Sequence, residues 1–201
     1  MEKSAIDLIC KKVTIRMNDF KTRINQLIIN ENLGLSLYEV EQLLNIKVTS
    51  PTPLHKLAPK YIPFYREVGR VYCILEIYKY ILPDYNEMWL LYGNGNMLAS
   101  DTNDTEVNDF VTRFEKFKNY TTENVTFLED LVVLNLEYCL EGEKVKDYLK
   151  DNIITNFANV FAGLNKLKNK LKLKDLNISW LLSNEGDMFE SFTNVNQPTE
   201  N

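Results

Sequence analysis

The sequence contains few residues that could carry out enzymatic chemistry. Its single histidine is His55, and no serine–acid pair or cysteine lies at a recognised spacing from it, so neither a catalytic triad nor a histidine metal site is indicated. The adjacent acids Glu129 and Asp130 could serve as acid and base or hold magnesium, but neighbours on a helix point about 100° apart. We therefore expect a protein that is not an enzyme and that needs no metal or cofactor.

A glycine-rich run, GNGN at 93–96, is the one stretch that suggests phosphate binding. A phosphate loop also needs a lysine and a following Ser or Thr, and both are missing here. We interpret the run as a connection between elements and expect no small-molecule substrate.

The charge of the chain is uneven, although its net value is only −5. Residues 51–82 hold five basic residues against two acids, a balance of +3, whereas residues 83–145 hold thirteen acids against four bases, a balance of −9. Opposite charges on two segments favour different partners for each. The cations of the basic segment are Lys56, Lys60, Arg66, Arg70 and Lys79.

Cysteine usage and hydropathy bear on the compartment. Cys10, Cys73 and Cys139 are odd in number and widely spaced, so they predict buried thiols in a reducing environment instead of a disulfide framework. No apolar run reaches the roughly 18 residues of a membrane span, and the first residues lack a signal-peptide core. We expect a cytoplasmic protein without membrane contact.

Apolar periodicity predicts helices in the first sixty residues. Positions three and four apart are apolar from 3 to 30, which is typical of an amphipathic helix that ends near Asn32 and Gly34. A second helix is expected over 36–46, where Ser36 and Glu39 have the spacing of a capping box. Prolines at 51, 53 and 59 leave room only for a short helix over about 53–58.

The stretch KYIPFYREVGRVYCI, from Lys60, is rich in β-branched and aromatic residues around a glycine. Such residues pack well on a pleated surface, and glycine permits a tight turn. The pattern predicts a strand, a turn at 67–69 and a second strand, followed by a helix over about 75–82.

The rest of the chain is predicted to be helical. Helices are expected over 107–117, over 122–141 and from 143 to about 174, with the lysines of KLKNKLKLK spread around the last of them. No repeat with a period of 20 to 50 residues is apparent.

The order of elements from 35 to 82, with LSLYEVEQLLNI, TPLHKL, KYIPFYREVGRVYC and EIYKYI, resembles the winged helix-turn-helix of phage excisionases and their MerR-like relatives. The resemblance implies that the second helix enters the major groove and that the hairpin, or wing, touches the DNA backbone. It implies DNA contacts from two groups of residues. These are Thr52, His55, Lys56 and Lys60 in or after the second helix, and Tyr65, Arg66 and Arg70 in the wing.

The expected fold is mainly α with one small β-hairpin: a winged helix-turn-helix followed by an α-helical bundle. We expect an N-terminal helix over 1–34, the winged domain over 35–92, an acidic helical domain over 93–182 and a polar tail over 183–201. The expected function is double-stranded DNA binding, by an oligomer of a phage or mobile element.

Two other functions fit the same residues. The first is a virion component, such as a subunit of a head–tail adaptor or connector ring, bound to copies of itself or to other assembly proteins. The second is an inhibitor or immunity protein that acts by acidic mimicry.

Overall fold

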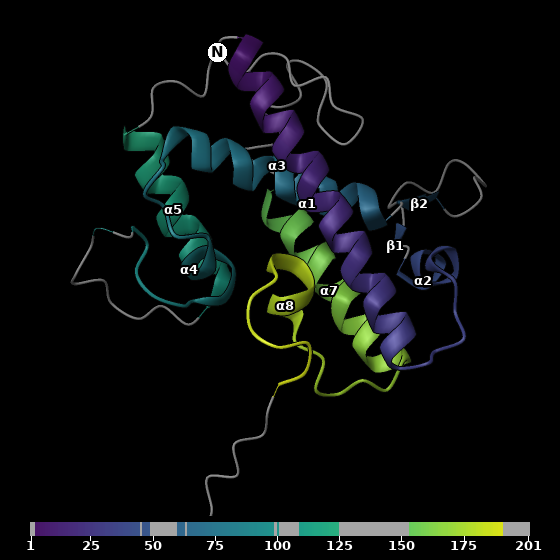
Figure 1. The fold of residues 1–201 in the computed structure, drawn as a ribbon. Helices are drawn as coiled ribbons and strands as arrows, with labels where there is room; N and C mark the ends of the chain where they lie inside the picture. The colour runs from purple at the N-terminus through teal and green to yellow at the C-terminus, as the bar shows by residue number, and fades with distance from the viewer. Residues whose placement is uncertain are drawn as a thin grey trace, which may run out of the picture.

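The computed structural model describes residues 3–44, 46–48, 60–62, 64–98, 100, 109–124 and 153–190. These residues are mostly helical, which confirms the mainly α class (Figure 1). The elements are α1 (Lys3–Asn30), α2 (Leu37–Leu44), β1 (Ile46–Val48), β2 (Lys60–Ile62), α3 (Phe64–Ile81), α4 (Glu87–Tyr92), α5 (Phe110–Asn124), α7 (Ile153–Lys170) and α8 (Ile178–Ser183).

Helix α1 has the bounds that its apolar periodicity predicts. One side of it is buried along its length, because apolar residues recur every three or four positions. Beyond its end, Asn32 (φ 48°) and Gly34 (φ 64°) turn the chain in the left-handed conformation. The buried apolar residues are Ala5, Ile9, Val13, Met17, Phe20, Ile24 and Leu27.

Helix α2 begins with the predicted capping box. Glu39 accepts a hydrogen bond of 2.7 Å from the backbone N–H of Ser36, and the Ser36 hydroxyl accepts one of 3.2 Å from the N–H of Glu39. The bonds from Ser36 lower the pKa of the Glu39 carboxyl because they stabilise its charged form. The local sequence therefore determines where this helix starts.

The predicted hairpin around Gly69 is wrong, because residues 64–81 form the single helix α3. Its β-branched and aromatic residues also recur at spacings of three and four, and they are buried on helices instead of a pleated sheet. Gly69 is buried inside the helix. The strand pairing that does occur is antiparallel between β1 and β2, with Lys47 opposite Tyr61.

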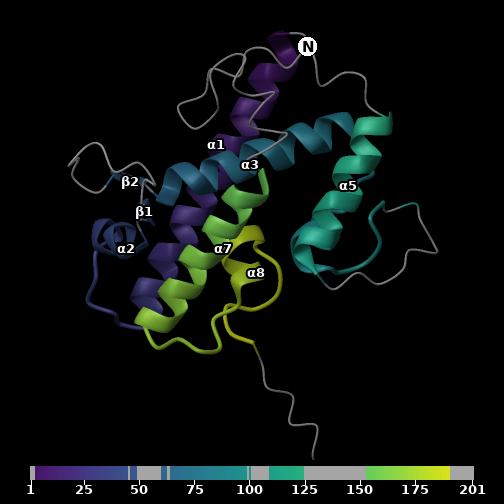
Figure 2. The same cartoon turned by 180° about the vertical axis from the view of Figure 1, so that it is seen from behind.

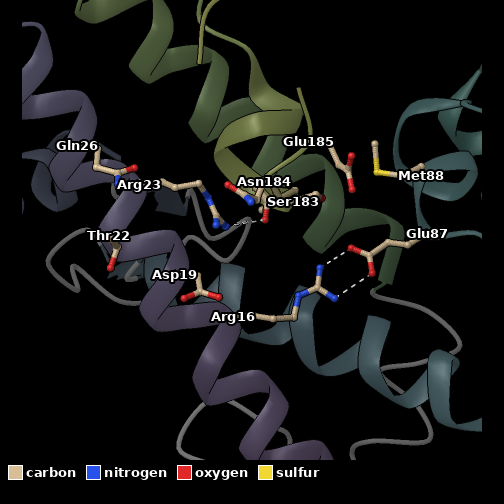
Figure 3. Close-up of a pocket in the computed structure, with 11 residues that line it drawn as sticks. Arg16, Asp19, Thr22, Arg23, Gln26, Glu87, Met88, Ser183, Asn184 and Glu185 are labelled. Atoms are coloured by element: carbon tan, nitrogen blue, oxygen red, sulfur yellow. Dashed lines mark hydrogen bonds and ion pairs between the residues drawn. The ribbon is translucent and has the colours of Figure 1, made fainter. Parts of the chain in front are cut away.

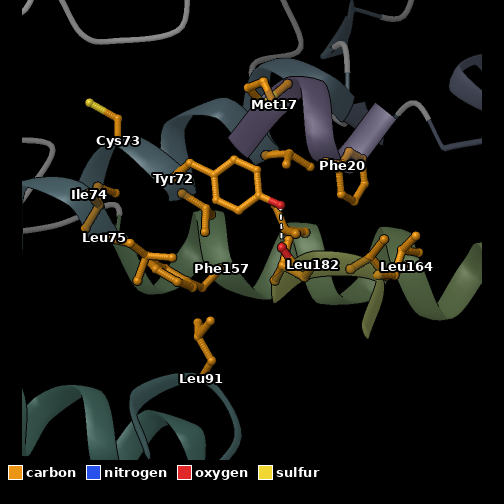
Figure 4. Close-up of a cluster of buried hydrophobic side chains, with 14 of the residues drawn as sticks. Met17, Phe20, Tyr72, Cys73, Ile74, Leu75, Leu91, Phe157, Leu164 and Leu182 are labelled. Atoms are coloured by element: carbon orange, nitrogen blue, oxygen red, sulfur yellow. Dashed lines mark hydrogen bonds between the residues drawn. The ribbon is translucent and has the colours of Figure 1, made fainter. Parts of the chain in front are cut away.

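The core forms where α3 packs against both α1 and α7 (Figures 1 and 2). Figure 4 shows Tyr72 of α3 in this core, with its hydroxyl donating a 2.5 Å hydrogen bond to the carbonyl of Leu182. At another point of contact, the ring of Phe64 lies over Gly163 of α7. The buried residues form one cluster that extends across residue 93, where we expected a domain boundary.

The chain contains an internal repeat with a period of about 90 residues, longer than the 20 to 50 residues that we considered. NDFKTR at 18–23 returns as NDFVTR at 108–113, with five of six residues identical. The segment 82–98 returns at 173–189, where eight of seventeen residues are identical. We call 82–98 and 173–189 the first and second Asn-Trp module, because each holds one of the two tryptophans after a capping asparagine.

The two modules have the same three-dimensional structure. Asn86 caps α4 and Asn177 caps α8, each with its side-chain oxygen accepting hydrogen bonds from the N–H groups two and three residues on. Each capping amide packs against a glycine with positive φ, Gly95 or Gly186, at which an added Cβ would lie within 3 Å of the amide nitrogen. Each module also closes with an isolated antiparallel bridge, Tyr85 to Leu98 and Leu176 to Phe189.

The repeat divides the helices into two units, and the module of each unit packs against a helix of the other unit. The first unit contains α1, α3 and α4, and the second contains α5, α7 and α8, yet α4 packs on α5 and α8 packs on α1. Arg23 of α1 donates bonds of 2.8 and 3.2 Å to consecutive carbonyls of α8, and Arg113 of α5 donates bonds of 3.4 and 3.2 Å to the equivalent carbonyls of α4. These carbonyls belong to Leu181, Leu182, Leu90 and Leu91.

The reciprocal contacts indicate a pseudo-twofold axis between the two units. Tyr92 and Ser183 occupy the same position in the two modules, and their hydroxyl groups lie 3.0 Å apart. Equivalent residues that touch each other must lie near the axis. The repeat and the exchanged modules together indicate a duplicated unit in an interlocked, dimer-like arrangement.

The remaining predictions for the second half have mixed outcomes. Of the helices expected over 107–117 and from 143 to about 174, residues 110–117 are helical in α5 and residues 153–170 form α7, whereas 107–108 and 143–152 lie outside the described residues. α7 ends at Lys170, and Lys172 adopts a left-handed conformation (φ 58°). The helix expected over 122–141 lies mostly outside the described residues. Cys10 is a free thiol, whereas Cys73 is in a disulfide, so the prediction of free thiols is wrong for Cys73.

Candidate binding cleft between the two units

A polar cleft of about 520 Å³ lies where the two units meet. One face of α1 forms its floor, the first turn of α4 forms one wall, and the end of α8 with the following residues forms the other (Figure 3). Eleven residues line it: Arg16, Asp19, Thr22, Arg23, Gln26, Glu87, Met88, Leu182, Ser183, Asn184 and Glu185.

Arg16 is fully engaged by the protein itself. Its guanidinium donates a 2.9 Å hydrogen bond and a second, shorter one to the Glu87 carboxylate, and a 3.1 Å bond to Glu76 (Figure 3). It also lies 4.4 Å from the centre of the Tyr72 ring. Burial acts to lower the pKa of Arg16, but the bonds and charges of Glu87 and Glu76 outweigh it, so the group stays charged and joins α1 to α4 and α3.

Arg23 is also committed to the fold. It is buried, and its guanidinium is directed to the two carbonyls at the end of α8. A buried guanidinium without such partners would be costly, so these bonds hold it in place. Neither arginine of the cleft is available for an anion.

The acceptors of the cleft remain open to a ligand. Asp19 on α1 and Glu185 after α8 are both exposed, and neither side-chain carboxylate forms an ion pair or hydrogen bond with another described residue. Asp19 lies on the floor and Glu185 on the wall that follows α8, and the exposed amides of Gln26 and Asn184 also line the cleft (Figure 3). The available groups therefore include two carboxylates and two amides.

Asp19 and its counterpart in the second unit, Asp109, have different structural roles. Asp109 occupies the same place in the repeated NDF-x-TR sequence and caps α5, where its carboxylate accepts bonds of 2.8 and 2.7 Å from Thr112. These bonds lower the pKa of Asp109. Asp19 lies inside α1, where no cap is needed, and Thr22 bonds instead to the carbonyl of Asn18. The fold uses Asp109 but makes no observed use of Asp19.

The cleft is suited to a group that carries positive charge. Three carboxylates line it against two arginines, and both arginines are already paired or hydrogen-bonded. An ammonium or guanidinium group in the cleft could donate hydrogen bonds to the carboxylate of Asp19 or of Glu185. Among the described residues, no group of three His, Cys, Asp or Glu side chains is placed to hold a metal ion.

The residues that the sequence suggested for DNA contact do not come together in the described part of the chain. Thr52, His55 and Lys56 lie outside it, and Lys60 is in β2, opposite Val48. The remaining three are on α3, as described next.

The three expected wing residues differ in exposure. Tyr65 is buried edge-on against Phe20. Arg70 forms a 2.7 Å ion pair with the buried carboxylate of Glu67. Arg66 is exposed. A helix in place of the wing turns two of these three side chains toward the protein itself.

Sequence reasoning missed the residues of the cleft. Asp19 and Arg23 appeared only as polar positions of an amphipathic helix, and Glu185 was placed in a polar tail. The signal that could have found them is the recurrence of NDF-x-TR at 18 and 108, together with that of L-x-D-x-N-x-x-W-L-L at 82 and 173.

None of the described helices combines the length and the apolar character needed to cross a membrane. Comparison of the chain with protein-family models, with curated proteins and with solved structures found no match.

Proposed function

We propose that this protein is a non-catalytic binding protein whose cleft accepts a basic side chain, an arginine or lysine, of a partner polypeptide. The observation that carries the proposal is the pair of exposed carboxylates, Asp19 on the floor and Glu185 on one wall, in a cleft whose own arginines already bond to the protein. A protein partner fits because the cleft is polar and open to solvent, without the mostly apolar lining typical of small-molecule pockets.

The interlocked architecture supports a scaffold role. The cleft walls come from different units, and Arg16 and Arg23 fix both walls to α1. A site held by buried ion pairs and hydrogen bonds is ordered before the partner arrives, which lowers the entropic cost of binding. This role agrees with the assembly-protein partners expected from the sequence.

The proposal can be tested by titrating the full chain, labelled with ¹⁵N, with N-acetyl-arginine methylamide. We expect weak binding, with a dissociation constant in the millimolar range or above, because a single exposed charge contact contributes at most about 1 kcal/mol. Shift changes should concentrate at residues 19–26 and 183–185. N-acetyl-citrulline methylamide, which has a similar shape without the charge, should produce none of them.

Two variants make the test specific. Asp19→Asn and Glu185→Gln should each weaken binding by about threefold, and by about tenfold together, since each removes one acceptor charge. Glu31→Gln, on an exposed carboxylate of the loop that follows α1, is the matched control and should leave affinity unchanged. Equal binding of the citrulline compound, or equal loss in the control, would refute the proposal.

Recognition of DNA through residues 52–70, and the expected place in a phage or mobile element, stay predictions. Of the residues expected to contact DNA, Arg66 offers an exposed cation on α3. Its contribution is measured by the control variant of the next experiment.

A further inference from the structure

A second charged surface lies at the far end of α7. The segment 153–174 contains no acidic residue and five lysines, all within its last nine positions. The helix ends at Lys170, and the left-handed Lys172 turns the chain back, so the lysines gather at one end of the molecule instead of spreading along a longer rod. The exposed lysines are Lys166, Lys170, Lys172 and Lys174.

The leucines and the lysines of this segment have separate roles. Leu164 and Leu167 are buried in the core, and Leu171 and Leu173 pack against it. Lys168 is half-buried and donates a 2.9 Å bond to the carbonyl of Leu176. The apolar side chains are therefore used by the fold.

Stabilisation of the helix end does not account for the exposed lysines. Cations near a helix C-terminus interact favourably with its dipole. Here the last turn is closed by backbone bonds, from Leu171 N–H to Leu167 and from Leu173 N–H to Lys168, both 2.9 Å. Lys172 and Lys174 lie beyond the helix, and neither forms an ion pair with a residue that the structure describes.

The surface also offers neutral donors beside the cations. Asn165 and Asn169 alternate with Lys166 and Lys170 along one side of α7, where with Ala162 they line a shallow hollow of about 460 Å³. Ammonium and amide groups are among the groups that contact phosphate oxygens in protein–DNA complexes.

We propose that this basic end of α7, formed by Asn165, Lys166, Asn169, Lys170, Lys172 and Lys174, binds the phosphodiester backbone of double-stranded nucleic acid without reading its sequence. A lipid surface fits less well, because membrane-binding segments insert an apolar face and the leucines here face the core. The proposal does not depend on the cleft, which is acidic and lies between other elements.

The test is fluorescence anisotropy of the full chain with a labelled 20-base-pair duplex, from 25 to 150 mM KCl. Binding through about four lysines should give a slope of log K against log salt near −3.6, because each phosphate contact contributes about −0.9. The double variant Lys172→Gln/Lys174→Gln should reduce the slope by about 1.8. A scrambled duplex should bind equally.

The matched control removes two exposed cations elsewhere, in the double variant Lys11→Gln/Arg66→Gln. It should leave the slope within about 0.3 of the wild-type value, since neither contact lies on the basic end. Thermal melting should show that both double variants remain folded.

Three outcomes would overturn the proposal. These are no binding at 25 mM KCl, an equal loss of slope in the two double variants, or tight binding to phosphatidylserine vesicles without binding to the duplex. A larger loss in the control would instead assign DNA contact to Lys11 of α1 or Arg66 of α3. If the arginine compound does not bind the cleft, the proposal for the basic end of α7 is unaffected, because the two surfaces are separate.

Discussion

At the scale of single residues, the two units each have a buried polar residue at the equivalent position of a core helix. Lys79 of α3 and Lys168 of α7 each donate a hydrogen bond to a backbone carbonyl of the module that follows, at 3.3 and 2.9 Å. Matching these two lysines aligns the sequence of α3 with that of α7. In that alignment Glu67 and Asn156 coincide, and each has one buried polar atom without a hydrogen bond among the described residues. Both units therefore keep a costly polar group in the core.

Glu67 gives a prediction about pH. Burial raises the pKa of its carboxyl, and the charge of Arg70 only partly opposes this. A raised pKa in the folded state means that the group's contribution to stability is complete at low pH and is lost as pH rises through the folded pKa. Glu67→Gln cannot titrate, so its free energy of unfolding relative to wild type should increase from pH 4 to pH 7.

Urea denaturation at each pH measures this difference. Glu39→Gln is the control with the opposite sign, because hydrogen bonds from Ser36 lower the pKa of Glu39. That variant should lose stability relative to wild type over the same pH range. A flat profile for Glu67→Gln would show that its carboxyl is not destabilised by burial.

At the scale of elements, the closest approach is between α3 and α7. The ring of Phe64 occupies the space beside Gly163 that a Cβ would need. A helical Gly→Ala change normally stabilises a protein by about 0.5–1 kcal/mol. Here Gly163→Ala should destabilise it by about 1–3 kcal/mol, because the ring and the backbone must move apart.

Chemical denaturation measures the change in the free energy of unfolding, and the sign of that change tests this prediction. Adding Phe64→Leu to Gly163→Ala should cost less than the sum of the two single changes, since the smaller side chain makes room for the methyl group. Strict additivity of the two changes would place the cause away from this contact.

At the scale of the whole molecule, the exchanged modules couple the two units. Because α8 is held by Arg23 of the first unit and α4 by Arg113 of the second, neither module can detach without loss on the other side. The hydroxyl contact between Tyr92 and Ser183 joins the modules directly. We expect the units to unfold together.

The two tryptophans allow this coupling to be measured, because each module holds one, Trp89 or Trp180. Arg23→Met should lower stability by about 2–3 kcal/mol, as it removes charge-assisted bonds to α8. In Trp180→Phe and Trp89→Phe backgrounds, which leave one reporter each, both transitions should shift equally. A shift of the transition seen by Trp180 alone would show that the units unfold independently. The control Arg66→Met, at an exposed position, should shift neither transition.

The local sequence determined the elements whose signals are short-range. The bounds of α1 follow from its apolar spacing, and the start of α2 follows from Ser36 and Glu39, because caps and periodicity act within a few residues. The repeat was also present in the sequence, at a period of about 90 that a search for shorter repeats does not reach.

The tertiary structure alone decided the form of residues 64–81 and the location of the cleft. Phe64, Val68 and Tyr72 suit a strand or a helix equally, and packing between α1 and α7 selected the helix. Asp19 and Glu185 are 166 residues apart in the chain and line the same cleft only because each unit binds the other's module. Long-range pairing of this kind depends on how whole surfaces fit together, which no local propensity encodes.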